Sequence, residues 1–366
     1  MDSSHSLTPV HLDLPLSFRQ EIVVPVFRAL RAGSSVALVG LRGCGASNLL
    51  RFLCQPRTAR ANGVDPQHML VAYVDDNLVR SYTERDVCRA AVDALAQAAR
   101  HGEWPDAEIG PLLDAARHYG DYERHMTGVG VLARVADVVC REQDKRAAFV
   151  FDDFDSAFTQ LDAPALRGLR AIRDRHRPAL SLVVKTRVEL NRLMAHRADG
   201  GSGSRPFVDL FERDTFAVGP YRRDDAVDLV RRKTSDWDRP ITGDQIDLAV
   251  RVAGGYPSLL LAALACAQSR PDAPASDLAL ALKRDRRVEA RCREVWLDLD
   301  PSEQRTLIEL AAGRRVSPDD ARTLRLRGLA VGHPPSVFCE LMEDFAARQS
   351  APVDDGQRLP SALRDP

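Results

Sequence analysis

A short glycine-rich segment holds the residues best suited to bind an anion. It reads Gly40-Leu41-Arg42-Gly43-Cys44-Gly45-Ala46-Ser47 and is followed by Asn48. Glycines let the backbone wrap closely around phosphate, because no Cβ holds the peptide N–H groups away. The apolar run SSVALVG precedes the segment, and the helix-like run SNLLRFLCQ follows it. The first turn of that helix would add partial positive charge. We therefore expect residues 40–48 to bind phosphate groups.

One residue departs from the phosphate-binding loop pattern G-x-x-x-x-G-K-[ST]. Gly40, Gly45 and Ser47 match it, but Ala46 stands where the lysine belongs. Ser47 is placed to bind Mg²⁺, whereas the absent lysine would neutralise charge on the β- and γ-phosphates. Losing one such group commonly costs about 100-fold to 1000-fold in rate. The sequence predicts binding of ATP or ADP with Mg²⁺, and weak or absent hydrolysis.

Two alternatives stay open for this segment. Arg42, Lys185 or Arg187 could supply the missing positive charge from nearby positions. The segment could also be only a glycine-rich turn between a strand and a helix.

A second candidate group ends the apolar run AAFVFDD. Asp152 is expected to reach Mg²⁺ through water, and Asp153 to orient an attacking water. Parallel strands present such residues at the edge where ligands bind, beside the glycine-rich segment. Asp155 is expected to be a helix N-cap or a surface carboxylate. The alternative is that Asp152 and Asp153 are ordinary loop acids.

The elements that must position these residues alternate between strand and helix. Apolar runs predict strands at 34–40, 69–77, 147–153, 180–186 and 214–218. Helical spacing predicts helices at 17–32, 47–55, 83–101, 108–118, 123–142 and 163–175. This alternation indicates an α/β fold with a doubly wound parallel sheet.

The pattern changes after Gly219, where only helices are expected, at 222–235, 243–253, 257–268 and 276–297. Helix starts at Asp300-Pro301 and Ser317-Pro318 come next, followed by strand, turn, strand and helix. That last order is typical of a winged helix. We predict a flexible leader (1–15), an α/β domain (16–218), a helical lid (219–297), a winged-helix domain (298–349) and a disordered tail (350–366).

Composition narrows the class of protein. A net charge of −1 gives no global attraction to nucleic acid or to an acidic membrane. The seven cysteines are scattered without a C-x-x-C pair, which fits free thiols in a reducing cytoplasm. No stretch of about 18 apolar residues predicts a membrane span. The richness in Ala, Asp and Arg indicates a GC-rich bacterial source.

The order of these features resembles the AAA+/STAND ATPases, including origin-recognition-like ATPases with a C-terminal winged helix. The similar stretches are SFRQEIVVPVFRALRAG, FDDFD, SLVVKTRVEL, FAVGPYRRDDAVDLVRR and GGYPSLLL, within residues 17–345. The resemblance implies a sensor role for Thr186, facing the γ-phosphate. It also implies that Pro257 lies near the nucleotide and couples its state to the lid. Arg213 is the best candidate for an arginine finger, and the turn before Pro257 could also be only a helix stop and restart.

The C-terminal module carries a modest group of arginines, namely Arg314, Arg315, Arg322, Arg325 and Arg327. A winged helix can place its second helix in the DNA major groove. Asp319 and Asp320 at the start of that helix oppose such binding, and packing explains Ala321, Leu324 and Gly328 equally well.

Three functions follow from these residues. The first is a nucleotide-gated switch that reports to a protein partner or acts through self-association. The second is a DNA-binding regulator or origin-recognition-like factor. The third is a pseudo-ATPase scaffold without nucleotide.

Overall fold

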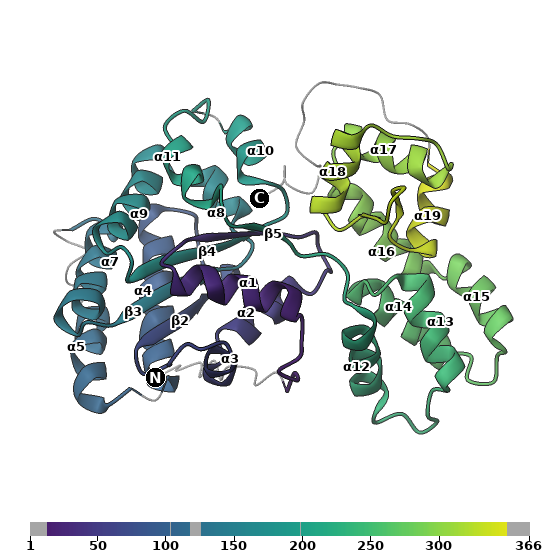
Figure 1. Cartoon of the computed structure of the whole chain (residues 1–366), viewed down its shortest axis with the longest axis horizontal. Helices are drawn as coiled ribbons and strands as arrows, with labels where there is room; N and C mark the ends of the chain where they lie inside the picture. Colours follow the sequence, from purple (N-terminus) through teal and green to yellow (C-terminus); the bar gives the residue numbers. More distant parts are fainter. Residues whose placement is uncertain (1–12, 103, 118–125, 198, 350–366) are drawn as a thin grey trace.

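The computed structural model describes residues 13–102, 104–117, 126–197 and 199–349. Residues 1–12 of the predicted leader and the whole predicted tail lie outside this part of the chain. The described chain forms an α/β half that contains the sheet, and a helical half joined to it after β5 (Figure 1).

Five parallel strands form the central sheet. They are β1 (Val36–Val39), β2 (Met69–Val74), β3 (Arg146–Phe151), β4 (Leu180–Thr186) and β5 (Thr215–Ala217). Their order is β2-β3-β4-β1-β5, and every neighbouring pair is parallel. Strands β1 and β4 are buried along their whole length, as strands covered on both faces must be. The predicted doubly wound parallel sheet is confirmed.

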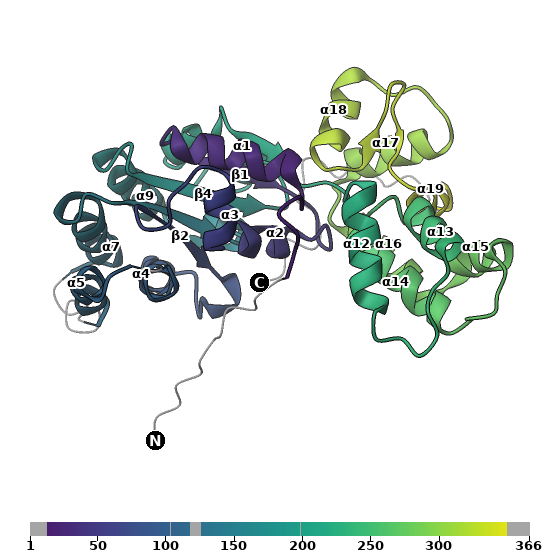
Figure 2. The ribbon, with the colours of Figure 1, turned by 60° about the horizontal axis from the view of Figure 1, so that its bottom comes forward.

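Helices cover both faces of the sheet (Figure 2). On one face, α1 (Gln20–Arg31), α2 (Ala46–Leu53) and α3 (Pro56–Ala61) pack on alternate strand residues such as Leu38 and Val183. On the other, α4 (Glu84–His101), α5 (Asp106–Arg117), α7 (Gly128–Asp137) and α9 (Ala163–Arg175) pack on residues such as Ala37 and Val184. Strand side chains alternate between faces, so this division follows from the sequence.

Several short elements were not predicted. They are α8 (Asp155–Gln160), α10 (Leu190–Ala195), α11 (Arg205–Val208) and α3. Each has four to six residues, whereas the π-helical turn at Val138–Glu142 continues α7 inside the helix predicted at 123–142. Such lengths are too short for a clear helical period, so packing rather than local propensity holds them.

The helical half begins with α12 (Arg223–Thr234), α13 (Gly243–Ala253) and α14 (Pro257–Gln268). Thr242 and Gln245 form the predicted capping box at the start of α13. The helix predicted at 276–297 is wrong, because two helices occur there, α15 (Ala275–Arg284) and α16 (Arg286–Leu297). Asp285 ends the first and caps the second, since its carboxylate accepts the Arg287 N–H.

The C-terminal unit contains α17 (Pro301–Ala311), α18 (Pro318–Leu326) and α19 (Glu340–Ala347). A two-stranded antiparallel hairpin of β6 (Ala330–Val331) and β7 (Ser336–Val337) precedes α19. This order of helix, helix, hairpin and helix follows the predicted pattern. The division into domains and the winged-helix assignment stay predictions.

Across the part of the chain that the structure describes, none of the helices has the length and apolar content needed to cross a membrane.

Candidate nucleotide-binding site

The carboxyl ends of the parallel strands bring the predicted site segments to one edge of the sheet. Strand β1 ends at Val39, directly before Gly40, and pairs with the end of β4 at Thr186. Strand β3 lies on the other side of β4 and ends directly before Asp152. The glycine-rich loop and the acidic strand end therefore share the edge at which such sheets bind ligands.

The loop has the backbone shape that an anion cradle needs. Gly43 and Gly45 have φ angles of 77° and 81°, in the left-handed region that favours glycine. Helix α2 begins at Ala46, and no side chain caps its first turn. The first N–H groups of a helix have no partner within the helix, so they are suited to phosphate. The loop fits a nucleotide phosphate in these respects.

The start of α14 and the turn before it lie directly on this loop. The Tyr256 hydroxyl donates a hydrogen bond to the Arg42 carbonyl at 2.6 Å, and the Ser258 N–H donates to the Gly43 carbonyl at 3.1 Å. A Cβ on Gly43 would collide with the Ser258 side chain. Pro257, predicted near the nucleotide, lies between these two residues and starts α14. The G-G-Y-P turn is thus in contact with the loop, and the nucleotide role of Pro257 stays a prediction.

Arg19 joins three segments beside the loop, and sequence reasoning missed it. Its side chain is buried and donates hydrogen bonds to the carbonyls of Cys44 and Gly219, at 3.2 and 2.8 Å. Its guanidinium lies 5.0 Å from the ring centre of Tyr221. A Cβ on Gly45 would lie 2.5 Å from the Tyr221 hydroxyl oxygen, so this ring also lies against the loop.

Asp152 is held on the α2 face of the sheet. It is 7% exposed and accepts a hydrogen bond from the Tyr73 hydroxyl at 2.8 Å. Arg51 of α2 covers the Tyr73 ring at 5.0 Å and pairs with Asp75. Asp152 thus lies on the face of the sheet that α2 covers, on the same side as the helix that follows the glycine-rich loop.

Asp153 has a different partner. It forms an ion pair with Lys185 of β4. Burial alone would raise the pKa of Asp153, but Lys185 lowers it below its ordinary value, and Arg187 and Arg42 add to this effect. The influence of Arg42 on Asp153 is consistent with the loop lying close to the acidic strand end.

The prediction that Asp155 is a helix N-cap or surface carboxylate is wrong. Asp155 is 1% exposed, is the first residue of α8 and accepts the backbone N–H of Arg187 at 2.9 Å. It ties the end of β4 to the end of β3, which the spacing F-D-D-F-D does not reveal.

Thr186 is fully buried, and its hydroxyl donates to the Val188 carbonyl at 2.7 Å. Contact with a γ-phosphate would require this hydrogen bond to break.

Ser47 is partly buried and Asn48 is exposed, both in the first turn of α2. Within the described residues, no group of three or more His, Cys, Asp or Glu could hold a metal ion. Mg²⁺ commonly binds one or two carboxylates together with phosphates and water, so Ser47 and Asp152 fit that role only with nucleotide present.

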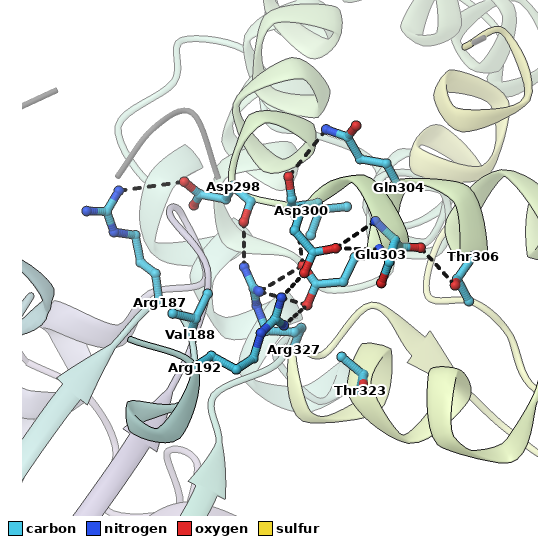
Figure 3. Close-up of polar contacts among 12 residues, drawn as sticks. Arg187, Val188, Arg192, Asp298, Asp300, Glu303, Gln304, Thr306, Thr323 and Arg327 are labelled. Carbon is cyan, nitrogen blue, oxygen red and sulfur yellow. Dashed lines mark hydrogen bonds and ion pairs between the residues drawn. The ribbon is translucent and has the colours of Figure 1, made fainter. Parts of the chain in front are cut away.

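Asp298, at the end of α16, reaches the loop from the helical half. Its carboxylate is completely buried and accepts the backbone N–H of Arg42 at 3.0 Å. The guanidinium groups of Arg42 and Arg187 each lie 3.7 Å from its other oxygen. Figure 3 shows the contact of Arg187 with Asp298. Sequence reasoning missed Asp298 as well, because its partners are far away in the chain.

A buried ion cluster continues from this point into the C-terminal unit (Figure 3). Arg327 binds both carboxylate oxygens of Glu303, at 2.9 and 3.0 Å, and the Asp298 carbonyl at 2.7 Å. Arg192 of α10 pairs with the same Glu303 at 2.6 Å and with Asp300. The cluster thus connects the α/β half to the C-terminal unit.

One of the arginines considered for DNA contact, Arg327, is buried. Arg327 is 2% exposed and is taken up by Glu303, so it cannot face DNA. Arg314, Arg315 and Arg322 are exposed.

Arg213, the candidate arginine finger, is exposed and directly precedes Asp214. The Asp214 carbonyl accepts the N–H of Ala37 at the amino edge of the sheet. Arg213 therefore lies at the opposite edge of the sheet from the glycine-rich loop of the same chain.

Comparison with solved structures gives the class of fold. A Walker-type ATPase of Pyrococcus abyssi matches with a TM-score of 0.53 at 14% identity, over 90% of this chain and 95% of that chain. The ADP form of ORC2 from Aeropyrum pernix matches at 13% identity, with a TM-score of 0.48, over 82% and 75%. Cdc6p of Pyrobaculum aerophilum matches at 14% identity, with a TM-score of 0.44, over 93% and 95%.

No protein-family model matches the sequence, and no curated protein matches it. The chain has the fold of a Walker-type P-loop ATPase with a helical C-terminal region. The resemblance to P-loop ATPases is confirmed at the level of the fold.

Proposed function

We propose that this chain is an ATP- or ADP-binding regulatory switch of the AAA+/STAND type, with weak or absent hydrolysis. The phosphates would lie on residues 40–48, with Mg²⁺ held by Ser47 and Asp152. Residues 219–297 would act as the lid, and residues 298–349 would report its position to a partner. The observation that carries this proposal is the direct attachment of the loop to Asp298 and Tyr256.

The attachment supports switching because Asp298 is itself an anion at an anion site. Its carboxylate occupies a loop N–H and two guanidinium groups, which are also suitable partners for phosphate. A γ-phosphate that reaches Arg42 and Arg187 would compete with Asp298. Displacing Asp298 would disturb the junction of α16 and α17, where Arg327 and Glu303 are bound. ATP and ADP would then favour different positions of the helical half.

Two features support slow hydrolysis. Ala46 supplies no positive charge at the start of α2, and Thr186 donates its hydroxyl to Val188. In the chain without nucleotide, Asp153 is also paired with Lys185 and cannot orient a water. A switch needs only binding and slow turnover.

Nucleotide binding is the first test. Mass spectrometry of the purified, acid-denatured chain should detect released nucleotide, or millimolar Mg-ATP or Mg-ADP should raise the melting temperature by a few degrees. Absence of both signals would remove the proposed function.

A matched pair of serine variants locates the site. Ser47→Ala should weaken Mg-dependent ATP binding by about three- to tenfold, as loss of one such interaction does. Ser276→Ala, at the exposed start of α15, should bind like the parent. Equal affinities for both variants would exclude Ser47 from the site.

A further inference from the structure

Lys185 is a buried cation at the sheet edge that carries the glycine-rich loop. It stands in register with Leu38, two residues before Gly40, and its side chain is 5% exposed. Side chains alternate along a strand, so Lys185 is on the same face as Val183, which packs in the core under α1 and α2. That is also the face of Asp152. Lys185 therefore lies on the loop side of the sheet.

The charge of Lys185 acts on the loop itself. Burial raises the pKa of the Cys44 thiol, and the ammonium of Lys185 is the strongest influence in the opposite direction, ahead of Arg19. Burial alone would lower the pKa of Lys185, but Asp153 and then Cys44 hold it above its ordinary value. Lys185 therefore carries its proton at neutral pH, beside a loop that has no lysine of its own.

Asp153, the ion-pair partner of Lys185, is well placed to leave. The Asp153 side chain is 48% exposed, so water can solvate its carboxylate once the pair is broken. Lys185 is buried and has no such access, so it requires an anion nearby. A phosphate on the loop would meet that requirement.

We infer that Lys185 supplies, from β4, the positive charge that Ala46 does not, by contacting the β-phosphate of ATP or ADP. This rests on the proposed nucleotide site. Phosphate and Asp153 then compete for one ammonium, and nucleotide binding releases Asp153. Arg42 and Arg187 are less suited to the β-phosphate because both flank the carboxylate of Asp298.

Two substitutions with opposite expected effects test the inference. In calorimetric titrations of the full chain with Mg-ADP and Mg-ATP, Lys185→Met should weaken binding by about 10- to 100-fold, as expected for a charged hydrogen bond. Asp153→Asn should keep or tighten binding, because it frees the ammonium. A merely structural ion pair would lose affinity in both variants. Lys145→Met, which removes a lysine paired with Glu108, should bind like the parent.

Rescue completes the test. Ala46→Lys in the Lys185→Met background should restore affinity, because it returns a cation to the loop. The double variant Lys185→Met/Asp153→Asn leaves neither charge unpaired, and it should fold yet bind weakly. Parent-like affinity in Lys185→Met or in the double variant would overturn the inference while leaving the proposed function intact. Failure of the parent chain to bind nucleotide would overturn both.

Discussion

The carboxylate of Asp298 accepts the backbone N–H of Arg42, although the two residues are 256 positions apart. Asp298 follows α16 in the helical half, whereas Arg42 belongs to the loop after β1. Both Arg42 and Arg187 lie against the same carboxylate. An anion supplied by the protein therefore bridges the loop and the helical half.

Removing the charge of Asp298 should strengthen the binding of ATP more than that of ADP. Asp298→Asn keeps an oxygen for the Arg42 N–H but no longer neutralises Arg42 and Arg187. Binding of ATP should tighten by about tenfold, the scale of one charged hydrogen bond, and ADP should gain less. Calorimetric titration with each nucleotide measures the difference.

The same variant should melt at a lower temperature without nucleotide, because Arg187 is buried and loses a carboxylate. Asp319→Asn, an exposed carboxylate in the first turn of α18, is the matched control and should change neither property. An ATP affinity that falls in Asp298→Asn would show that the carboxylate supports the site and does not compete for it.

Restoring the missing lysine should raise turnover. Ala46→Lys places an ammonium at the first residue of α2, where it can neutralise phosphate charge during transfer. ATPase activity should rise by about 100-fold or more over the parent if the remaining residues can support hydrolysis. Ala46→Met has similar length without charge and should leave activity at the parent level. Equal rates for the two variants would mean that charge at residue 46 does not limit hydrolysis.

The sheet and most long helices were predictable from the sequence because their patterns are local. The run VALV is entirely apolar, and the run RAAFVF is apolar after Arg146, as is typical of buried parallel strands. The capping residues Thr242 and Asp300 marked their helices correctly. The break at Asp285 was missed, since helical spacing continues on both sides of it.

The site was only partly predictable, because its partners come from distant parts of the chain. Gly43 and Gly45 could be singled out by their spacing alone. Arg19, Tyr221 and Asp298 reach the same loop from three other segments, and no local pattern connects them to it. Arg327 was only a candidate for DNA contact, with packing left open, and its burial depends on Glu303 of another helix.

Removing one charge of the Glu303–Arg327 pair should destabilise the fold more than removing both charges together. Both side chains are 2% exposed. Glu303→Ala leaves the Arg327 guanidinium buried without its carboxylate, which should cost about 3–5 kcal/mol of unfolding free energy. Glu303→Gln/Arg327→Met removes both charges and retains an oxygen for the Asp300 N–H, so it should cost much less. Urea unfolding of both variants compares them; equal losses would mean that packing, not charge, dominates here.

Asp76 should make stability depend on pH. The pKa of Asp76 is raised to about 6: burial contributes most, the hydrogen bond from the Tyr82 hydroxyl opposes it, and the nearby carboxylates of Asp153, Asp152 and Asp75 add to the rise. In the unfolded chain the pKa of an aspartate is about 3.9. Between these values the folded state binds more protons than the unfolded state, so stability falls as pH rises from about 4 to 6.

Asp76→Asn should remove this loss, because the amide has no charge and still offers an oxygen to Tyr82. The free energy of unfolding should increase by about 1 kcal/mol at pH 7.5, a value reduced for solvent screening because Asp76 is partly exposed. At about pH 4, where Asp76 is protonated in the folded state, the gain should nearly vanish. Urea unfolding of parent and variant at both pH values measures it. A gain in unfolding free energy of the same size at both pH values would mean that the charge of Asp76, and its repulsion by Asp152 and Asp153, does not limit stability.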